Sequence, residues 1–147
     1  MSSLIGAAVV RTDAESKVRG EAVYGVDYSE VGMLYGKLLR SPVPAGLITV
    51  LDTKPALRIP GVHSVLTAAD APVARAGAVV RDQPLFADSL VRYEGEPIAG
   101  VVADSEAAAR RALDEIILEI ESLPAAGDLE TATAPNAALV HPDADRY

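Results

Sequence analysis

The chain has 147 residues, 50% of them hydrophobic, a formal net charge of −8 at pH 7 and no cysteine. This length is typical of one domain, and the hydrophobic content is sufficient for a core. The negative charge argues against nucleic-acid binding, because neutralising phosphates takes clustered Lys and Arg side chains. The lack of Cys excludes disulfides, iron–sulfur ligation and zinc–thiolate sites in this chain.

No apolar run approaches the roughly 20 residues that cross a bilayer, and no basic region followed by an apolar signal core opens the chain. We therefore expect no membrane segment and a cytoplasmic location. Aromatic residues make up only 4% of the chain. A core built from Val, Leu, Ile and Ala suits a buried sheet covered by Ala-rich helices.

The N-terminal half predicts short strands separated by turns. Charged residues alternate over 9–17 without an apolar face, which indicates extended or irregular surface backbone. Alternating apolar residues then predict strands over the ranges 18–28, 33–40, 47–52 and 62–67. Pro42 and Pro44 must break the second of these strands, and Thr53 is a candidate N-cap for a short helix over 53–57.

The segment 71–89 has weak periodicity and predicts a long loop with one strand at 78–80. Loops of this length are often functional, so this one is a candidate surface for contact with another molecule. An ordered connection without a function fits the same residues.

The stretch 91–121 is the most regular part of the chain. It predicts a strand at 91–93, a turn over 94–96, a strand at 97–103, a helix over 106–116 and a strand at 118–121. The helix has an apolar stripe at Ala109, Leu113, Ile116 and Ile120, and Ser105 suits its N-terminus.

These elements predict an α/β (α+β) domain with a mixed sheet, in which 97–121 forms a right-handed β-α-β crossover with two parallel strands. Residues 125–147 are rich in Ala, Pro, Asp and Thr and predict an extended tail or linker. The domain itself would therefore span residues 1–124.

Catalytic motifs are absent from the sequence. His63 and His141 have no metal-ligand spacing, and we interpret them as a strand residue and a linker residue. Glu94 and Glu96 flank Gly95 and could act as an acid–base pair, although turn carboxylates are mostly solvated.

Arg40 is the sharper polar feature, because it ends a predicted strand just before Ser41 and Pro42. Its guanidinium could clamp an anion or a neighbouring chain through paired hydrogen bonds. A local ion pair with one of the 21 acidic residues is the alternative.

Several strings resemble the large subunit of the xanthine dehydrogenase and aldehyde oxidase family, the molybdenum hydroxylases. In chain order they are Asp13, Lys17, Val18, Gly20, Ala22, Tyr24 and Asp27; Gly32, Met33 and Leu34; Leu39, Arg40, Ser41, Pro42 and Pro44; Pro60, Gly61, Val62, Val65, Thr67 and Asp70; Tyr93, Gly95, Glu96, Pro97, Ile98 and Ala99; Leu123, Pro124 and Ala125; and Leu139, Val140 and His141. The resemblance covers nearly the whole chain and implies an α/β hammerhead domain.

The chain departs from the family pattern at two places. Arg19 stands where the family has a small hydroxyl residue, and Ala45, Gly46 and Leu47 stand where His, Ala and Arg commonly follow the second Pro. The chain also stops before the glycine-rich segments that hold the pterin and before the glutamate that acts as base in the family. We therefore expect no catalytic, cofactor-binding or metal-binding residue in this chain.

The resemblance implies a non-catalytic structural or interface domain of a molybdopterin-dependent oxidoreductase. Its partners would be a molybdopterin-binding domain or subunit and an iron–sulfur subunit, so that molybdopterin, an iron–sulfur cluster and, as a further option, FAD belong to those partners. The expected interface residues are Arg40, Tyr93, Glu94, Gly95, Glu96 and Pro97. The alternative is a free-standing binding or regulatory module that takes a small ligand at the loop 71–89.

Overall fold

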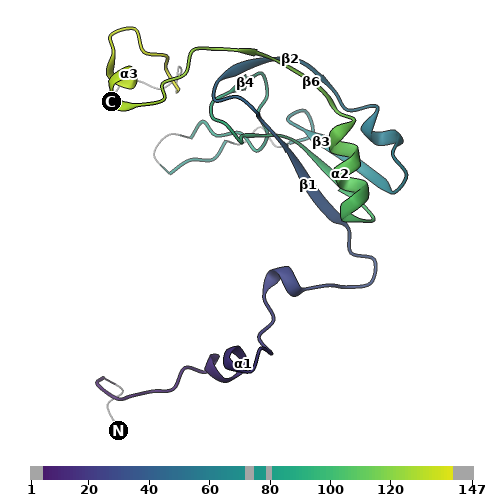
Figure 1. Ribbon diagram of the computed structural model, residues 1–147, viewed down its shortest axis with the longest axis vertical. Helices are drawn as coiled ribbons and strands as arrows, with labels where there is room; N and C mark the ends of the chain where they lie inside the picture. The colour runs from purple at the N-terminus through teal and green to yellow at the C-terminus, as the bar shows by residue number, and fades with distance from the viewer. Residues whose placement is uncertain (1–4, 72–74, 79–80, 141–147) are drawn as a thin grey trace. The chain divides into compact units, whose positions relative to one another are not determined.

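The computed structural model describes residues 5–71, 75–78 and 81–140 (Figure 1). The chain divides into two compact units, Met1–Met33 and Leu34–Tyr147, and each is described by itself. Two residues of the strand expected at 78–80, and His141, lie outside the described residues.

The first unit contains the short helix α1 (Ala14–Val18) and the 3₁₀ turn η1 (Gly25–Asp27). The amide of Glu21 donates to the Ser16 carbonyl at 2.8 Å and that of Gly20 donates to the Lys17 carbonyl at 3.2 Å. With Gly20 at a φ of +71°, this is a Schellman motif that ends α1. The extended or irregular backbone expected over 9–17 is therefore wrong for residues 14–17, which are helical.

The strand expected over 18–28 is also wrong. In η1 the carboxylate of Asp27 accepts a hydrogen bond from the Tyr24 amide at 3.0 Å. In a strand, that amide would donate to the main chain of a neighbouring strand instead. No described residue of this unit is buried. Without a face to pack against, the alternation of Ala22, Tyr24 and Val26 does not produce a strand.

Within its described residues, the second unit contains two three-stranded sheets in which every pairing is antiparallel. The first sheet has the order β1 (Tyr35–Arg40), β5 (Pro97–Ala103), β3 (Val62–Thr67), and the second has the order β4 (Leu90–Val91), β2 (Gly46–Asp52), β6 (Ile117–Ser122). The α+β class is confirmed. The strands expected near 33–40, 47–52, 62–67, 97–103 and 118–121 are also found, within a few residues at their ends.

The parallel β-α-β crossover expected over 97–121 is not found, because β5 and β6 belong to different sheets. Both edges of β5 are already paired, one with β1 and the other with β3. No edge is left for β6, which pairs antiparallel with β2 instead. The helix between them, α2 (Glu106–Asp114), thus connects two sheets.

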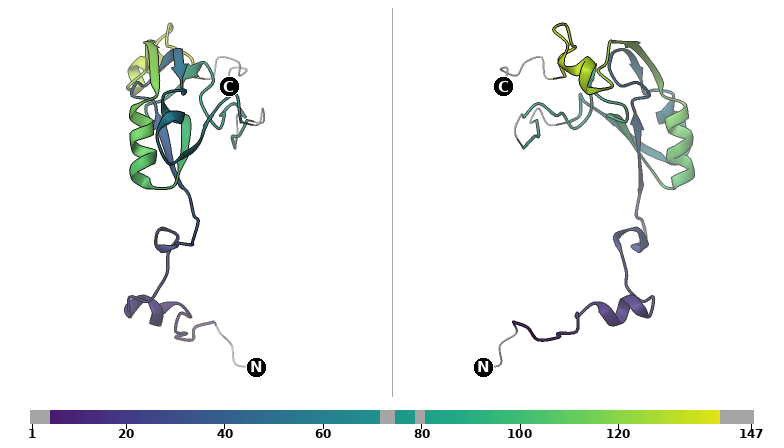
Figure 2. Two further views of the ribbon diagram at one scale, coloured as in Figure 1. Left: turned by 90° about the vertical axis from the view of Figure 1, so that its right-hand side faces the viewer. Right: turned by 60° about the vertical axis from the view of Figure 1, so that its left-hand side comes forward.

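Helix α2 covers one face of the first sheet (Figure 2). It begins at Ser105, whose side chain accepts a hydrogen bond from the Ala108 amide at 3.2 Å, as the sequence predicts. Its buried side packs on the sheet almost entirely through small side chains. The buried residues of this cluster are Ala56, Ala99, Val101, Ala103, Ala108, Ala109, Ala112 and Ile116.

The remaining helical segments are short. The helix expected from Thr53 appears three residues later, as the 3₁₀ turn η2 (Ala56–Arg58). The region expected as an extended tail contains α3 (Leu129–Thr133), whose N-cap Asp128 accepts a hydrogen bond from the Thr131 amide at 2.7 Å. Directly after α3 the described backbone turns over 134–137, where the Ala137 amide donates to the Ala134 carbonyl at 3.0 Å, so the region is not extended throughout.

Gly46 offers a test of the packing in the second sheet. A Cβ atom there would lie 2.4 Å from a methyl carbon of Ile120 and 2.9 Å from the main-chain oxygen of Glu121. Gly46→Ala should therefore lower the free energy of unfolding in urea by about 1–3 kcal/mol, the usual range for overpacking. Gly36→Ala is the matched control, because a Cβ there meets no atom within 4 Å. Equal stability of the two variants would contradict this packing.

Candidate functional site at the turn before β5

The turn of four residues from Tyr93 to Glu96 connects β4 in one sheet to β5 in the other. It is closed by the Glu96 amide, which donates to the Tyr93 carbonyl at 3.2 Å. Gly95, at the third position, has a φ of +87°, a value that type II turns require there and that L side chains rarely adopt. Gly95 thus sets the turn geometry.

The turn is fixed to the end of β1 by three hydrogen bonds. The Ser41 amide donates to the Glu96 carbonyl and the Gly95 amide donates to the Ser41 carbonyl, both at 2.9 Å. The Arg40 guanidinium donates to the Gly95 carbonyl at 2.9 Å, across 55 residues of sequence. The hydrogen bond found for Arg40 therefore goes to a main-chain oxygen, where the sequence suggested a carboxylate, an anion or a neighbouring chain.

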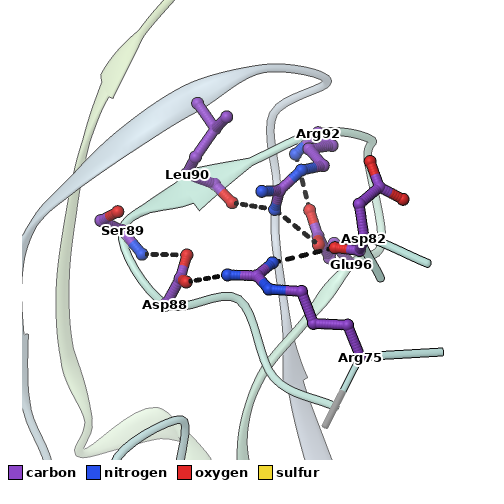
Figure 3. Close-up of polar contacts among 7 residues, drawn as sticks. All are labelled: Arg75, Asp82, Asp88, Ser89, Leu90, Arg92 and Glu96. Atoms are coloured by element: carbon purple, nitrogen blue, oxygen red, sulfur yellow. Dashed lines mark hydrogen bonds and ion pairs between the residues drawn. The ribbon is translucent and has the colours of Figure 1, made fainter. Parts of the chain in front are cut away.

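Glu96 lies inside the protein, with 2% of its surface exposed. Its Oε2 accepts a hydrogen bond from the Arg92 amide at 2.6 Å, and its Oε1 lies 3.7 Å from Nη1 of Arg92. The same Nη1 donates to the Leu90 carbonyl at 3.1 Å (Figure 3). The expectation of solvated turn carboxylates thus holds for Glu94, which is exposed, and is wrong for Glu96.

A second arginine organises the loop beside this turn. Arg75 donates to the Asp82 carbonyl and pairs with the Asp88 carboxylate, both at 2.9 Å (Figure 3). The Ser89 amide also donates to Asp88, at 2.7 Å. This amide, with Arg75 as a further cause, holds the pKa of Asp88 below its ordinary value. The described parts of the loop 71–89 are thereby tied together at both ends.

An apolar pocket of about 320 Å³ lies against the turn. Its described lining comes from 44–45, 90–94, 123–126 and 138–140, and includes Tyr93 and Glu94. None of these residues belongs to the loop 71–89, where a small ligand was the alternative expectation.

The six expected interface residues lie together. Arg40 and Pro97 are partners in the β1–β5 pairing, and the other four form the turn. Tyr93 is 43% exposed. Sequence reasoning missed the role of Arg92, although its spacing of four from Glu96 across a glycine turn is a readable signal.

The described residues do not fit a metal centre, because no three His, Cys, Asp or Glu side chains among them gather as ligands would. His63 is a β3 residue, as expected, and its Nε2 lies 2.6 Å from a carboxylate oxygen of Asp104. Within the same part of the chain, none of the helices has the length and apolar character needed to cross a bilayer.

Glu96→Gln tests whether this carboxylate stabilises the turn. Loss of its charge leaves the Arg92 guanidinium, whose side chain is 12% exposed, without its counter-ion, so the free energy of unfolding in urea should fall by about 2–4 kcal/mol. Glu94→Gln, at the exposed neighbouring position, should change it by less than about 0.5 kcal/mol. A Glu96→Gln variant as stable as Glu94→Gln would show that the pair contributes nothing.

Asp88 provides a test by pH. Because its folded pKa is lowered, the contribution of this carboxylate is complete above its ordinary pKa and is lost as the pH falls through the lowered value. The NMR shift of the Ser89 amide should therefore titrate below the ordinary range of an aspartate, and Asp88→Asn should abolish that transition. A transition within or above the ordinary range contradicts the assignment.

A model of the "Aldehyde oxidase and xanthine dehydrogenase, a/b hammerhead domain" family matches residues 19–124. Among curated proteins, a probable xanthine dehydrogenase subunit of Bacillus subtilis is 42% identical over 135 residues, which are 91% of this chain and 18% of that protein. The "Nicotinate dehydrogenase large molybdopterin subunit" of Eubacterium barkeri is 36% identical over 95% of this chain and 33% of that protein.

Among solved structures, the aldehyde oxidoreductase from Desulfovibrio desulfuricans superposes with a TM-score of 0.82 at 32% identity, over 93% of this chain and 17% of that one. This chain therefore spans between 17% and 33% of the lengths of these three proteins. The family match covers more than half of the chain, and the fold agrees with it. The chain belongs to the aldehyde oxidase and xanthine dehydrogenase family, whose α/β hammerhead domain it carries.

Proposed function

We propose that this chain is a non-catalytic interface domain of a molybdopterin-dependent oxidoreductase of the xanthine dehydrogenase and aldehyde oxidase type. The observation that carries the proposal is the burial of Glu96, one of the two carboxylates of the candidate acid–base pair. Its Oε2 is engaged by a main-chain amide at 2.6 Å and its other oxygen faces Arg92. A carboxylate held in this way shapes a turn and is withdrawn from a substrate.

The exposed part of the same turn forms the proposed contact surface. Tyr93 and Glu94 extend outward, while Gly95 and Pro97 hold the backbone and Arg40 fixes it to β1. Tyr and Arg are enriched at protein interfaces, and an apolar pocket beside an aromatic side chain suits an inserted side chain of a partner.

The partners in this proposal are a molybdopterin-binding domain or subunit and an iron–sulfur subunit. The names of the relatives support the first, because one is a large molybdopterin subunit. Iron–sulfur ligands must come from elsewhere, since this chain has no Cys, and FAD would likewise belong to a partner. We propose a cytoplasmic location for the assembly and a hammerhead domain of residues 1–124, with 125–147 as a linker.

Purification tests the proposal directly. The chain should bind a molybdopterin-binding polypeptide of its source organism when the two are produced together, and the chain produced alone should contain no stoichiometric molybdenum by elemental analysis. Tyr93→Ala should weaken the complex by about tenfold in Kd, as removal of an aromatic contact does. Ile117→Ala is the control, because Ile117 is 48% exposed on β6.

Stoichiometric molybdenum in the chain alone would overturn the non-catalytic role. Failure of the unaltered chain to bind the molybdopterin-binding polypeptide would overturn the interface role. Equal weakening by Tyr93→Ala and Ile117→Ala would leave the domain's role in place and remove the turn from the interface.

A further inference from the structure

The first sheet has two faces that differ in character. On the face toward α2, Lys37 pairs with Glu106 of that helix, and Val65 and Val101 pack in its core. The opposite face, called the outer face, is formed by alternate residues of the three strands, because side chains alternate across a strand. The register places the outer face at Gly36, Leu38, Ser64, Leu66, Gly100 and Val102.

Apolar side chains on the outer face are half exposed. Leu38 and Leu66 are opposite the same residue of β5, Gly100, and each is 41% exposed. A Cβ atom built on Gly36 would meet nothing within 4 Å, so the sheet is uncovered at that end. None of these six residues carries a charge, and the next alternate residue of β1, Arg40, follows a register shift and donates from its guanidinium to the Gly95 carbonyl.

A single aromatic ring covers the centre of this face. A Cβ on Gly100 would lie 3.3 Å from the ring of Phe86, which is 8% exposed. Phe86 belongs to the loop 71–89, whose described parts lie on the side of the sheet away from α2 (Figure 2). Leu38 and Leu66 remain accessible on either side of the strand that this ring covers.

We propose that the outer face is a docking surface for the molybdopterin-binding polypeptide. The inference rests on the proposed function and deepens it, since it adds a second contact region that is separate from the turn before β5. An apolar, uncharged sheet face with half-exposed leucines is typical of a surface that another polypeptide covers.

The choice of occupant follows from length and charge. The chain matches 18% of the Bacillus subtilis protein and 33% of the Eubacterium barkeri protein, so each relative has far more polypeptide outside the match than within it. A second copy of this chain is disfavoured, because two copies with a net charge of −8 each repel one another. The uncharged face therefore suits a different polypeptide.

Site-specific photo-crosslinking tests the inference in the intact complex. The full chain is produced in its source organism with p-benzoylphenylalanine in place of Leu66, and the complex with the molybdopterin-binding polypeptide is irradiated. The control carries the same crosslinker in place of Leu57, which is 49% exposed on η2. We expect crosslinks from position 66 to the molybdopterin-binding polypeptide, identified by mass spectrometry, at several times the yield from position 57.

Affinity provides the second readout. Leu66→Asp should weaken the complex by about tenfold or more in Kd, because a carboxylate on a dry apolar contact loses its hydration. Leu57→Asp should leave the Kd unchanged, and equal thermal midpoints of the two variants show that the effect is on binding.

The outcomes separate this inference from the proposed function. If the complex forms but gives no crosslink from position 66 to the molybdopterin-binding polypeptide, the outer face is not the docking surface. The proposed interface role of the domain then remains. Crosslinks from position 66 to a second copy of the chain also overturn the inference. A chain that forms no complex with the molybdopterin-binding polypeptide overturns the proposed function and the inference together.

Discussion

The second unit depends on the pairing of β5, which has a neighbour on each of its edges. Main-chain groups of a buried strand must be paired, and β1 and β3 satisfy those of β5. The strand that follows β5 cannot pair with it, so the chain continues through α2 to β6 in the second sheet. The two sheets, the helix between them and the turn that enters β5 all follow from this one arrangement.

The turn before β5 shows how a charged side chain serves an architectural purpose. Arg92 and Glu96 lie between the last residue of β4 and the first residue of β5, so their hydrogen bonds hold together the ends of two different sheets. A buried pair of this kind contributes little net stability relative to apolar residues, yet breaking it is costly. Its value is to fix one geometry for a turn whose outer residues face solvent.

The sequence predicts local features well because their signals are local. Alternation of apolar residues predicts β2 and β3, and Ser105 with the stripe through Ala109 predicts α2. Partner choice between strands is not local, since the apolar pattern of β6 fits a parallel or an antiparallel neighbour equally. The burial of Glu96 likewise depends on what surrounds the turn, and the alternation before Tyr28 has no sheet to join.

In the first unit, local signals for a helix were present in the sequence but were not used in the prediction. Its helix α1 is held by contacts within a few residues, including the pair of Lys17 with Asp13, which lowers the pKa of that carboxylate. Such features are readable as capping and turn signals once a helix is considered. The alternation of apolar residues instead led to the prediction of a strand, because the pattern is the same in an exposed segment as in a sheet.

The alanines between α2 and the first sheet have a consequence for the whole domain. Small side chains let a helix approach a sheet closely, but each buries far less apolar surface than a leucine would. The packing of α2 on the sheet is therefore stabilised by many van der Waals contacts that each contribute little. These contacts form only when the backbones of the helix and the sheet keep their close spacing. A domain built in this way gains much when a larger body covers its remaining faces, so folding and assembly are expected to be thermodynamically linked.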